Sequence, residues 1–299
     1  MEYHQPVLLH ETVNGLNIDP NGVYVDVTFG GGGHSKAILQ KLENGKLFAF
    51  DQDVDALENC LDDERFVLIN QNFRYLKKSL RLHGITQVDG VLADLGVSSH
   101  QFDAAERGFS IREDGDLDMR MNQSQILSAK EVVNDYEVNE LAAVLRKYGE
   151  LKNAYPMSLS IERFRENSPI KTTADLKEAV KNNMPPHKSN KILAQLFQAI
   201  RIEVNEEMAA LEEMLLQSVE VLKPNGRLSV ISYHSLEDRL VKNLIKKGKF
   251  EGELERDLYG NVDLPLNAIN RKPILPAEEE IQENSRARSA KLRIAEKVA

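Results

Sequence analysis

The chain has 299 residues and a formal net charge of −9 at pH 7, with a pI of about 5.4. A chain of this length buries roughly 75% of the surface that its unfolded form exposes, so a large core is available. The acidic balance argues against a large nonspecific grip on nucleic acid, and no apolar run approaches the ~20 residues that a membrane span needs.

The cysteine and histidine content and the N-terminal residues argue against a disulfide-bonded, metal-binding or secreted protein. Cys60 is the only cysteine, which rules out an intramolecular disulfide and favours a reducing cytosol. The seven histidines show no ligand-like spacing, so we expect no metal site. Residues 1–6 lack the basic and then apolar pattern of a signal peptide. These observations together predict a cytoplasmic protein.

The first predicted element is a buried strand at residues 23–29, which leads into a glycine turn. β-branched and aromatic residues alternate along it, four glycines follow at 30–33, and a helical pattern opens at Ser35. Bare backbone can approach a ligand closely there, and free N–H groups point at it, so the turn predicts a site for an adenine-containing cofactor. A tight turn without a ligand is the alternative, at a cost of about 0.5–1 kcal/mol per glycine relative to alanine in a regular element.

The second predicted strand, Lys46–Asp51, ends in a carboxylate. Asp51 follows Gly30 by 21 positions, close to the ~20 at which an acidic residue reaches a ribose hydroxyl. This spacing suits both a dinucleotide and S-adenosylmethionine. Ser35 stands where the dinucleotide fingerprint has its last glycine, which weakens the case for a dehydrogenase without excluding it.

Two more predicted strands end at candidate binding residues. Residues 66–69 predict the third strand, and Phe73 beyond it either stacks on an adenine ring or belongs to the core. Val88–Asp94 predict the fourth strand, which a turn with glycine and serine follows. Ligands of doubly wound sheets bind outside the carboxyl ends of the strands. Four candidate residues lie at or near such strand ends: Asp26, Asp51, Phe73 and Asp94.

The sheet pattern breaks after Gln101 and returns beyond residue 204. Residues 124–204 are mostly helical in pattern, and a helical segment at 208–222 then leads to a fifth strand at 227–232. We therefore predict an α/β fold with a doubly wound, mostly parallel sheet and an inserted all-helical domain. The predicted parts are residues 1–105 and 205–299 for the sheet domain, and 106–204 for the insertion.

Two basic groups interrupt the acidic composition. The first comprises Lys242, Lys246, Lys247 and Lys249. The second comprises Arg286, Arg288, Lys291, Arg293 and Lys297. Solvated element faces and a local phosphate-binding surface both account for such groups.

Several long strings, in this order, carry a resemblance to a known family. They are HQPVLLHE at 4–11, TFGGGGHS at 28–35, DLGVSS at 94–99, ERGFS at 106–110, LDMRM at 117–121, FQAIRI at 197–202, SYHSLEDR at 232–239 and RARSAKLR at 286–293. With them the chain resembles, nearly end to end, the bacterial ribosomal RNA small-subunit methyltransferase H family, also called MraW. His100 departs from a proline common in the family, and Glu203 from a tryptophan seen in some members.

The resemblance implies a Rossmann-like methyltransferase domain with an inserted helical domain. It implies transfer of a methyl group from S-adenosylmethionine to the exocyclic N4 of a cytidine in 16S ribosomal RNA, within the small subunit or its precursor. The cofactor contacts that it implies are Gly32, Gly33, His34, Asp51, Phe73, Asp94 and Gln101.

Asp94 is the candidate catalytic residue. It either positions the amino group of the base and accepts its hydrogen, or only binds the amino-acid end of the cofactor. After the fifth strand, His234 or Ser235 is a candidate for the base pocket, with helix capping as the alternative for Ser235.

Two other classes of function stay open. An NAD-dependent oxidoreductase shares the glycine turn and Asp51, although the sequence offers no hydride-transfer constellation. A non-enzymatic ribosome-assembly factor shares the RNA-binding surfaces. We expect no membrane partner, and the oligomeric state stays open, a homo-oligomer included.

Overall fold

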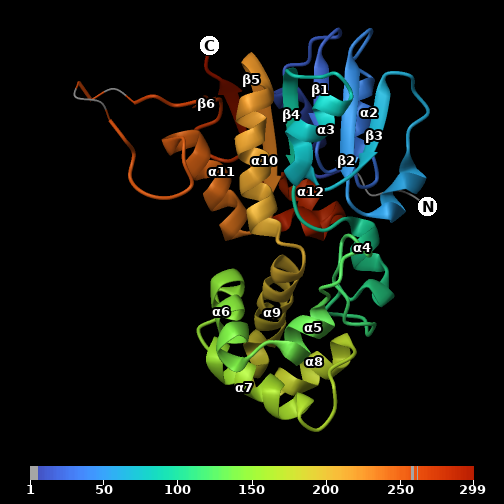
Figure 1. Cartoon of the computed structure of the whole chain (residues 1–299), viewed down its shortest axis with the longest axis vertical. Helices are drawn as coiled ribbons and strands as arrows, with labels where there is room; N and C mark the ends of the chain where they lie inside the picture. The colour runs from blue at the N-terminus through green and yellow to red at the C-terminus, as the bar shows by residue number, and fades with distance from the viewer. Residues whose placement is uncertain (1–5, 257–258, 261) are drawn as a thin grey trace. The chain divides into compact units, whose positions relative to one another are not determined.

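The computed structural model describes residues 6–256, 259–260 and 262–299 and divides into two compact units (Figure 1). One unit holds the residues up to 96 and those from 208 onward, and the other holds residues 97–207. The sequence pattern predicts these divisions after residues 105 and 204. The first comes earlier because Val97 and Phe102 pack against the core of the second unit. His4 and Gln5 of the first family string lie outside the described residues.

The first unit is built on a seven-stranded sheet with the order β3-β2-β1-β4-β5-β7-β6. Its parallel strands are β1 (Val23–Asp26), β2 (Lys46–Asp51), β3 (Phe66–Asn70), β4 (Val88–Asp94) and β5 (Leu222–Ser232). Strands β7 (Lys291–Lys297) and β6 (Leu266–Ala268) extend it in antiparallel register. The predicted doubly wound, mostly parallel sheet is therefore confirmed.

Strand β5 begins earlier than the sequence pattern predicts. Residues 224–226, Pro-Asn-Gly, predict a turn before a strand at 227–232, yet they lie within β5. The pairing with β4 jumps there, from Val88 opposite Leu222 to Gly90 opposite Arg227. Asn225 takes a positive φ of 65° at this irregularity. The turn residues thus form a bulge inside the strand.

Helices cover both faces of the sheet. The first unit contains α1 (Leu9–Gly15), α2 (Gly33–Leu39), α3 (Leu76–Leu82), α10 (Glu207–Val221), α11 (Ser235–Lys247) and α12 (Glu278–Glu283). Because side chains alternate along a strand, Tyr24 packs with α1 and α2, whereas Val25 packs with α3, α10 and α11. Among the described residues, no helix is long and apolar enough to cross a membrane.

The second unit is helical, as expected for the insertion. Its helices are α4 (Ser99–Asp103), α5 (Ala129–Asp135), α6 (Val138–Gly149), α7 (Ala154–Arg165), α8 (Thr173–Val180) and α9 (Ser189–Val204). Capping boxes begin α4, α5 and α8, at Ser98, Ser128 and Thr172. The loop between α4 and α5 is ordered because the Asn205 side chain donates to the Met119 carbonyl and accepts from the Met121 N–H.

One member of the second basic group is structural. Arg293 of β7 pairs with Asp238 of α11, with Nε 2.7 Å from Oδ1, and both side chains are largely buried. Lys291 lies 3.8 Å from the same carboxylate. Arg286 and Arg288, by contrast, are exposed on the short 3-10 helix Ser285–Ser289. Arg286 and Arg288 are therefore solvent-facing members of the group, whereas Arg293 is not.

Candidate active site

The glycine turn joins β1 to α2 in a conformation that needs glycine. Gly32, which precedes α2, has a φ of 75°. A Cβ on Gly32 would lie 3.0 Å from the Phe29 ring, and one on Gly33 would lie 2.1 Å from Cγ of Pro6. The chain at Pro6 therefore approaches the turn at a distance that only a bare backbone allows.

A fully buried carboxylate lies beneath this turn. Asp26, the last residue of β1, accepts hydrogen bonds from the Ser35 hydroxyl at 2.8 Å and the Thr28 N–H at 3.1 Å. Thr28 Oγ1 in turn accepts from the Asp94 N–H at 2.6 Å. Burial raises the pKa of Asp26, and neighbouring His34 and Ser35 oppose that shift. Hydrogen bonds thus connect the glycine turn to the end of β4.

Asp51 ties the end of β2 to the same turn. Its Oδ2 accepts from the Gly30 N–H at 2.8 Å, and its Oδ1 accepts from the Asp53 N–H at 2.9 Å. Burial raises the pKa of Asp51 to about 6, against the lowering effect of these two backbone donors. Both carboxylate oxygens keep a further lone pair, which suits a ribose hydroxyl as donor.

Phe73 and Gln101, the other two predicted cofactor contacts, lie in different units of the structure. Phe73 begins the short 3-10 helix Phe73–Tyr75 after β3, where its partly buried ring packs against the sheet core. Gln101 lies in the second unit, where its Oε1 accepts from the Ser98 N–H at 3.0 Å and completes the capping box of α4. Their contacts with a cofactor remain predictions.

Asp94 is held by groups from several elements. Its Oδ1 accepts a hydrogen bond of 2.7 Å from the Tyr233 hydroxyl, and its Oδ2 lies 3.8 Å from His34 Nδ1. Burial raises the pKa of Asp94 to about 7, while the Tyr233 hydrogen bond lowers it and the Glu237 charge raises it further. The side chain is nevertheless 23% exposed, so a substrate group can reach it.

His34 is a neutral neighbour of this carboxyl. Its Nε2 lies 3.2 Å from the Val7 carbonyl, which can only accept, so Nε2 carries the hydrogen and Nδ1 carries none. Burial lowers the pKa of His34, although the charge of Asp26 opposes the shift. The ring therefore joins the segment before α1 to the edge where Asp94 lies.

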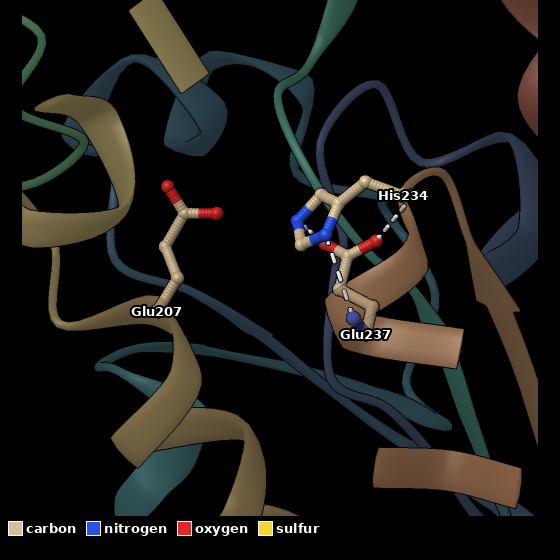
Figure 2. Close-up of side chains that lie close together, drawn as sticks. All are labelled: Glu207, His234 and Glu237. Carbon is tan, nitrogen blue, oxygen red and sulfur yellow. Dashed lines mark hydrogen bonds and ion pairs between the residues drawn. The ribbon is translucent and has the colours of Figure 1, made fainter. Parts of the chain in front are cut away.

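The turn after β5 is fixed by Glu237, which is only 2% exposed. Its Oε2 accepts from the backbone N–H groups of Tyr233 at 2.8 Å and His234 at 3.2 Å. Figure 2 shows the His234 ring beside this carboxylate, with Nε2 3.1 Å from Oε1. Glu207, also labelled there, begins α10 and pairs with Arg201 at 2.8 Å.

His234, not Ser235, caps α11. Its Nδ1 accepts from the Glu237 N–H at 3.4 Å, and the Glu237 side chain returns to the cap backbone. The capping role considered for Ser235 therefore belongs to its neighbour. Nδ1 of His234 thus accepts a hydrogen bond from Glu237, whereas the buried Nε2 lies 3.1 Å from Glu237 Oε1 without a hydrogen bond. A base-pocket role for His234 stays a prediction.

The sequence pattern indicates no role for Tyr233 or Thr28, although both lie within the family strings. Their partner is Asp94 in each case, at sequence separations of 139 and 66 residues. A local sequence pattern does not predict contacts between residues so far apart in the chain. The string at 232–239 pointed to the right segment, but not to the phenol as its functional group.

The residues at this edge fit the cofactor that the resemblance implies. A turn that a Cβ would obstruct lies beside one carboxylate with spare lone pairs, and a partly exposed carboxyl lies at the end of β4. The sheet and this site together define a Rossmann-like enzyme that binds an adenine-containing cofactor.

The chain belongs to the MraW methylase family, whose model matches residues 1–298. A ribosomal RNA small subunit methyltransferase H from Flavobacterium johnsoniae is 64% identical over 299 residues, which cover 100% of this chain and 99% of the relative. The protein of the same name from Bacteroides thetaiotaomicron is 54% identical over 298 residues, or 99% and 98% of the two chains.

Solved structures are similar at lower identity. An rRNA methylase from Streptococcus thermophilus is 14% identical, with a TM-score of 0.44 and coverage of 100% of this chain and 99% of the other. A methyltransferase from Streptococcus mutans in complex with SAH is also 14% identical, with a TM-score of 0.45 and full coverage of both chains.

Family membership confirms the resemblance, the enzyme class and the cofactor expected from the sequence. The protein is an S-adenosylmethionine-dependent methyltransferase. Neither the NAD-dependent oxidoreductase nor the non-enzymatic assembly factor applies.

Substitution of Gly32 tests whether the turn holds the cofactor. Gly32→Ala places a side chain at a φ of 75° beside Phe29, and we expect it to weaken S-adenosylmethionine binding about tenfold or more. Gly84→Ala is the matched control, because Gly84 has a φ of 74° and a Cβ there would have no neighbour within 4 Å. Both variants should lose about 1–2 kcal/mol of unfolding free energy. Calorimetric titration that finds equal cofactor affinity in the two variants would contradict this placement.

Proposed function

We propose that the protein transfers a methyl group from S-adenosylmethionine to the exocyclic N4 of a cytidine in 16S ribosomal RNA, within the small subunit or its precursor. The names of relatives at 53–64% identity support an RNA substrate in the small subunit. The observation that carries the choice of an amino group is the partly exposed Asp94 carboxyl at the end of β4. Such a substrate implies that the enzyme acts in the cytoplasm.

The cofactor site comprises the edge where the parallel strands end. Its proposed contacts are Gly32, Gly33, His34, Asp51, Phe73 and Asp94, and the family resemblance also implies Gln101. S-adenosylmethionine brings a methyl group that is already activated by its sulfonium centre. The protein's own task is alignment, with the reacting atoms ~3–3.5 Å apart.

Asp94 addresses the weak nucleophilicity of cytosine N4. The N4 lone pair is delocalised into the ring, and an acceptor for an N4 hydrogen localises that pair as the transition state forms. Asp94 has the required acceptor oxygens, and with a pKa of about 7 it is substantially ionised at neutral pH. Binding only the amino-acid end of the cofactor is the alternative role for the same carboxylate.

The RNA is held by basic side chains outside the cofactor site. A cytidine must leave any stack to reach the site, which costs less in single-stranded or splayed RNA. Exposed Arg286 and Arg288 are suited to phosphate contacts, whereas Arg293 is committed to Asp238. We assign the remaining RNA contacts to the inserted unit.

Asp94→Asn separates the two roles of this carboxyl. If Asp94 accepts the N4 hydrogen, methyl incorporation into small subunits that lack the modification should fall about 100-fold or more, because an amide oxygen is a poor proton acceptor. S-adenosylmethionine affinity should change by less than about threefold, or ~0.7 kcal/mol. A parallel loss of affinity and activity would assign Asp94 to the cofactor alone.

Charge reversal tests the RNA surface. The double variant Arg286→Glu, Arg288→Glu should weaken RNA binding about tenfold at low salt and flatten its salt dependence. Cofactor affinity and melting temperature should stay at the wild-type values, because both side chains are exposed. Unchanged RNA affinity would remove these arginines from the RNA surface, and loss of both affinities would indicate misfolding.

A further inference from the structure

Tyr233 lies at the active-site edge, where contacts of both its backbone and its ring fix its position. Its backbone N–H donates to the buried Glu237 carboxylate at 2.8 Å, and its ring packs in the small core formed by Val7, Leu8 and their neighbours. A Cβ on Gly96, two residues beyond Asp94, would lie 3.6 Å from Cδ2 of Tyr233, so the ring lies close to the turn after β4. The phenol therefore has little freedom to move away from Asp94.

The hydroxyl of Tyr233 serves as a donor to Asp94. Burial raises the pKa of Tyr233 well above its usual value, and the carboxyls of Asp94, Glu237 and Glu280 raise it further. The phenol thus stays protonated throughout the working pH range. Its hydrogen is directed at Oδ1 of Asp94, with an O–O distance of 2.7 Å.

The second oxygen of Asp94 is in a different position. Oδ2 lies 3.8 Å from His34 Nδ1, the ring nitrogen without a hydrogen, because Nε2 donates to the Val7 carbonyl. Within the described ranges, Oδ2 accepts no hydrogen bond. Oδ1 of this carboxyl therefore already accepts a hydrogen bond from a fixed donor, whereas Oδ2 keeps its full capacity to accept.

We propose that Tyr233 is a positioning residue for methyl transfer, because its hydroxyl occupies Oδ1 of Asp94 and leaves Oδ2 as the oxygen that receives the N4 hydrogen of the cytosine. This inference rests on the proposed function of Asp94. In the step itself, the N4 lone pair forms a bond to the methyl carbon while the carbon–sulfur bond breaks and its electron pair stays on sulfur. One N4 hydrogen leaves as a proton to Oδ2, so the methylated amine ends neutral and Asp94 ends protonated.

The same hydrogen bond controls when Asp94 can accept a proton. The groups that face Asp94 are Tyr233 after β5, His34 of α2, Glu237 of α11 and Asp26 of β1. Among the residues that the structure describes, the Tyr233 hydroxyl alone donates a hydrogen bond to the carboxylate, and this favours the ionised form. Its removal raises the pKa of Asp94, so the acceptor becomes available only at higher pH.

Tyr233→Phe tests the proposal through the pH dependence of single-turnover methyl transfer, measured from pH 6 to 9. The wild-type rate should rise through a midpoint near the Asp94 pKa of about 7. In the variant the midpoint should move up by about one pH unit, and this shift alone should lower the rate at pH 7 about fivefold. The plateau at high pH should also lie below that of the wild type, because Oδ2 is no longer held in one orientation. The Kd for S-adenosylmethionine should stay within about twofold.

Tyr136→Phe is the matched control. Tyr136 also donates to a carboxylate, with its hydroxyl 2.9 Å from Oε1 of Glu203, and its pKa is likewise raised by burial and by that carboxylate. Neither residue is among the groups that shift the pKa of Asp94, so loss of this pair should leave the midpoint at the wild-type value.

Two results would overturn the positioning role. A Tyr233→Phe profile with the wild-type midpoint and plateau would make the phenol structural only. A midpoint shift of equal size in Tyr136→Phe would show that the shift does not come from Asp94. Failure of the underlying function is distinguishable, because a fully active Asp94→Asn variant would remove Asp94 from catalysis whatever Tyr233 does.

Discussion

A buried carboxylate, Asp26, determines how the other groups of this site are placed. It cannot meet water, so its oxygens are satisfied by Ser35 and Thr28 on either side of the glycine turn. The Thr28 hydroxyl also accepts a hydrogen bond from the Asp94 N–H, so the position of β4 depends on the same group. One unsolvated group thereby fixes the turn where the cofactor is proposed to bind relative to the carboxyl that is proposed to act on the base.

The same edge shows how burial and hydrogen bonding separate three carboxyls. Asp26 has no access to water, Asp51 receives two backbone donors and has a pKa raised to about 6, and Asp94 has a pKa raised to about 7. The chemistry follows from the hydrogen bonds, because both oxygens of Asp51 accept from backbone N–H groups, whereas among the described residues Oδ2 of Asp94 accepts none. Asp51 is suited to hold a hydroxyl, and Asp94 to take up a proton.

Local pattern was enough to predict the architecture. The strand ends at Asp51 and Asp94 can be located because β periodicity and glycine punctuation act over a few residues, and the structure confirms them. Strand β1 ends at Asp26, three residues before the end of the predicted strand at 23–29. The bulge in β5 cannot be predicted from the sequence, because Pro-Asn-Gly has the composition of a turn and only its pairing with β4 keeps it in the sheet. The edge of the helical unit shifted for a similar reason, because the packing of Val97 and Phe102 is a tertiary property.

The contacts that define the site chemistry are long-range, and this is why the sequence did not reveal them. Tyr233 reaches Asp94 across 139 positions, and Arg293 pairs with Asp238 across 55. Arg293, which the sequence places in a basic group suited to RNA, thus forms an ion pair within the fold instead. In the sequence, Ser35 stands out only as a departure from the last glycine of the dinucleotide fingerprint, whereas in the structure its hydroxyl is one of the donors that buried Asp26 requires.

The identity of the methylated atom tests the account most directly. Small subunits that lack the modification would be incubated with the protein and S-adenosylmethionine carrying a labelled methyl group, and the 16S RNA would be digested to nucleosides for mass spectrometry. The account predicts label in N4-methylcytidine, at a single position. Label on a ring carbon, on a ribose hydroxyl or on another RNA would contradict it.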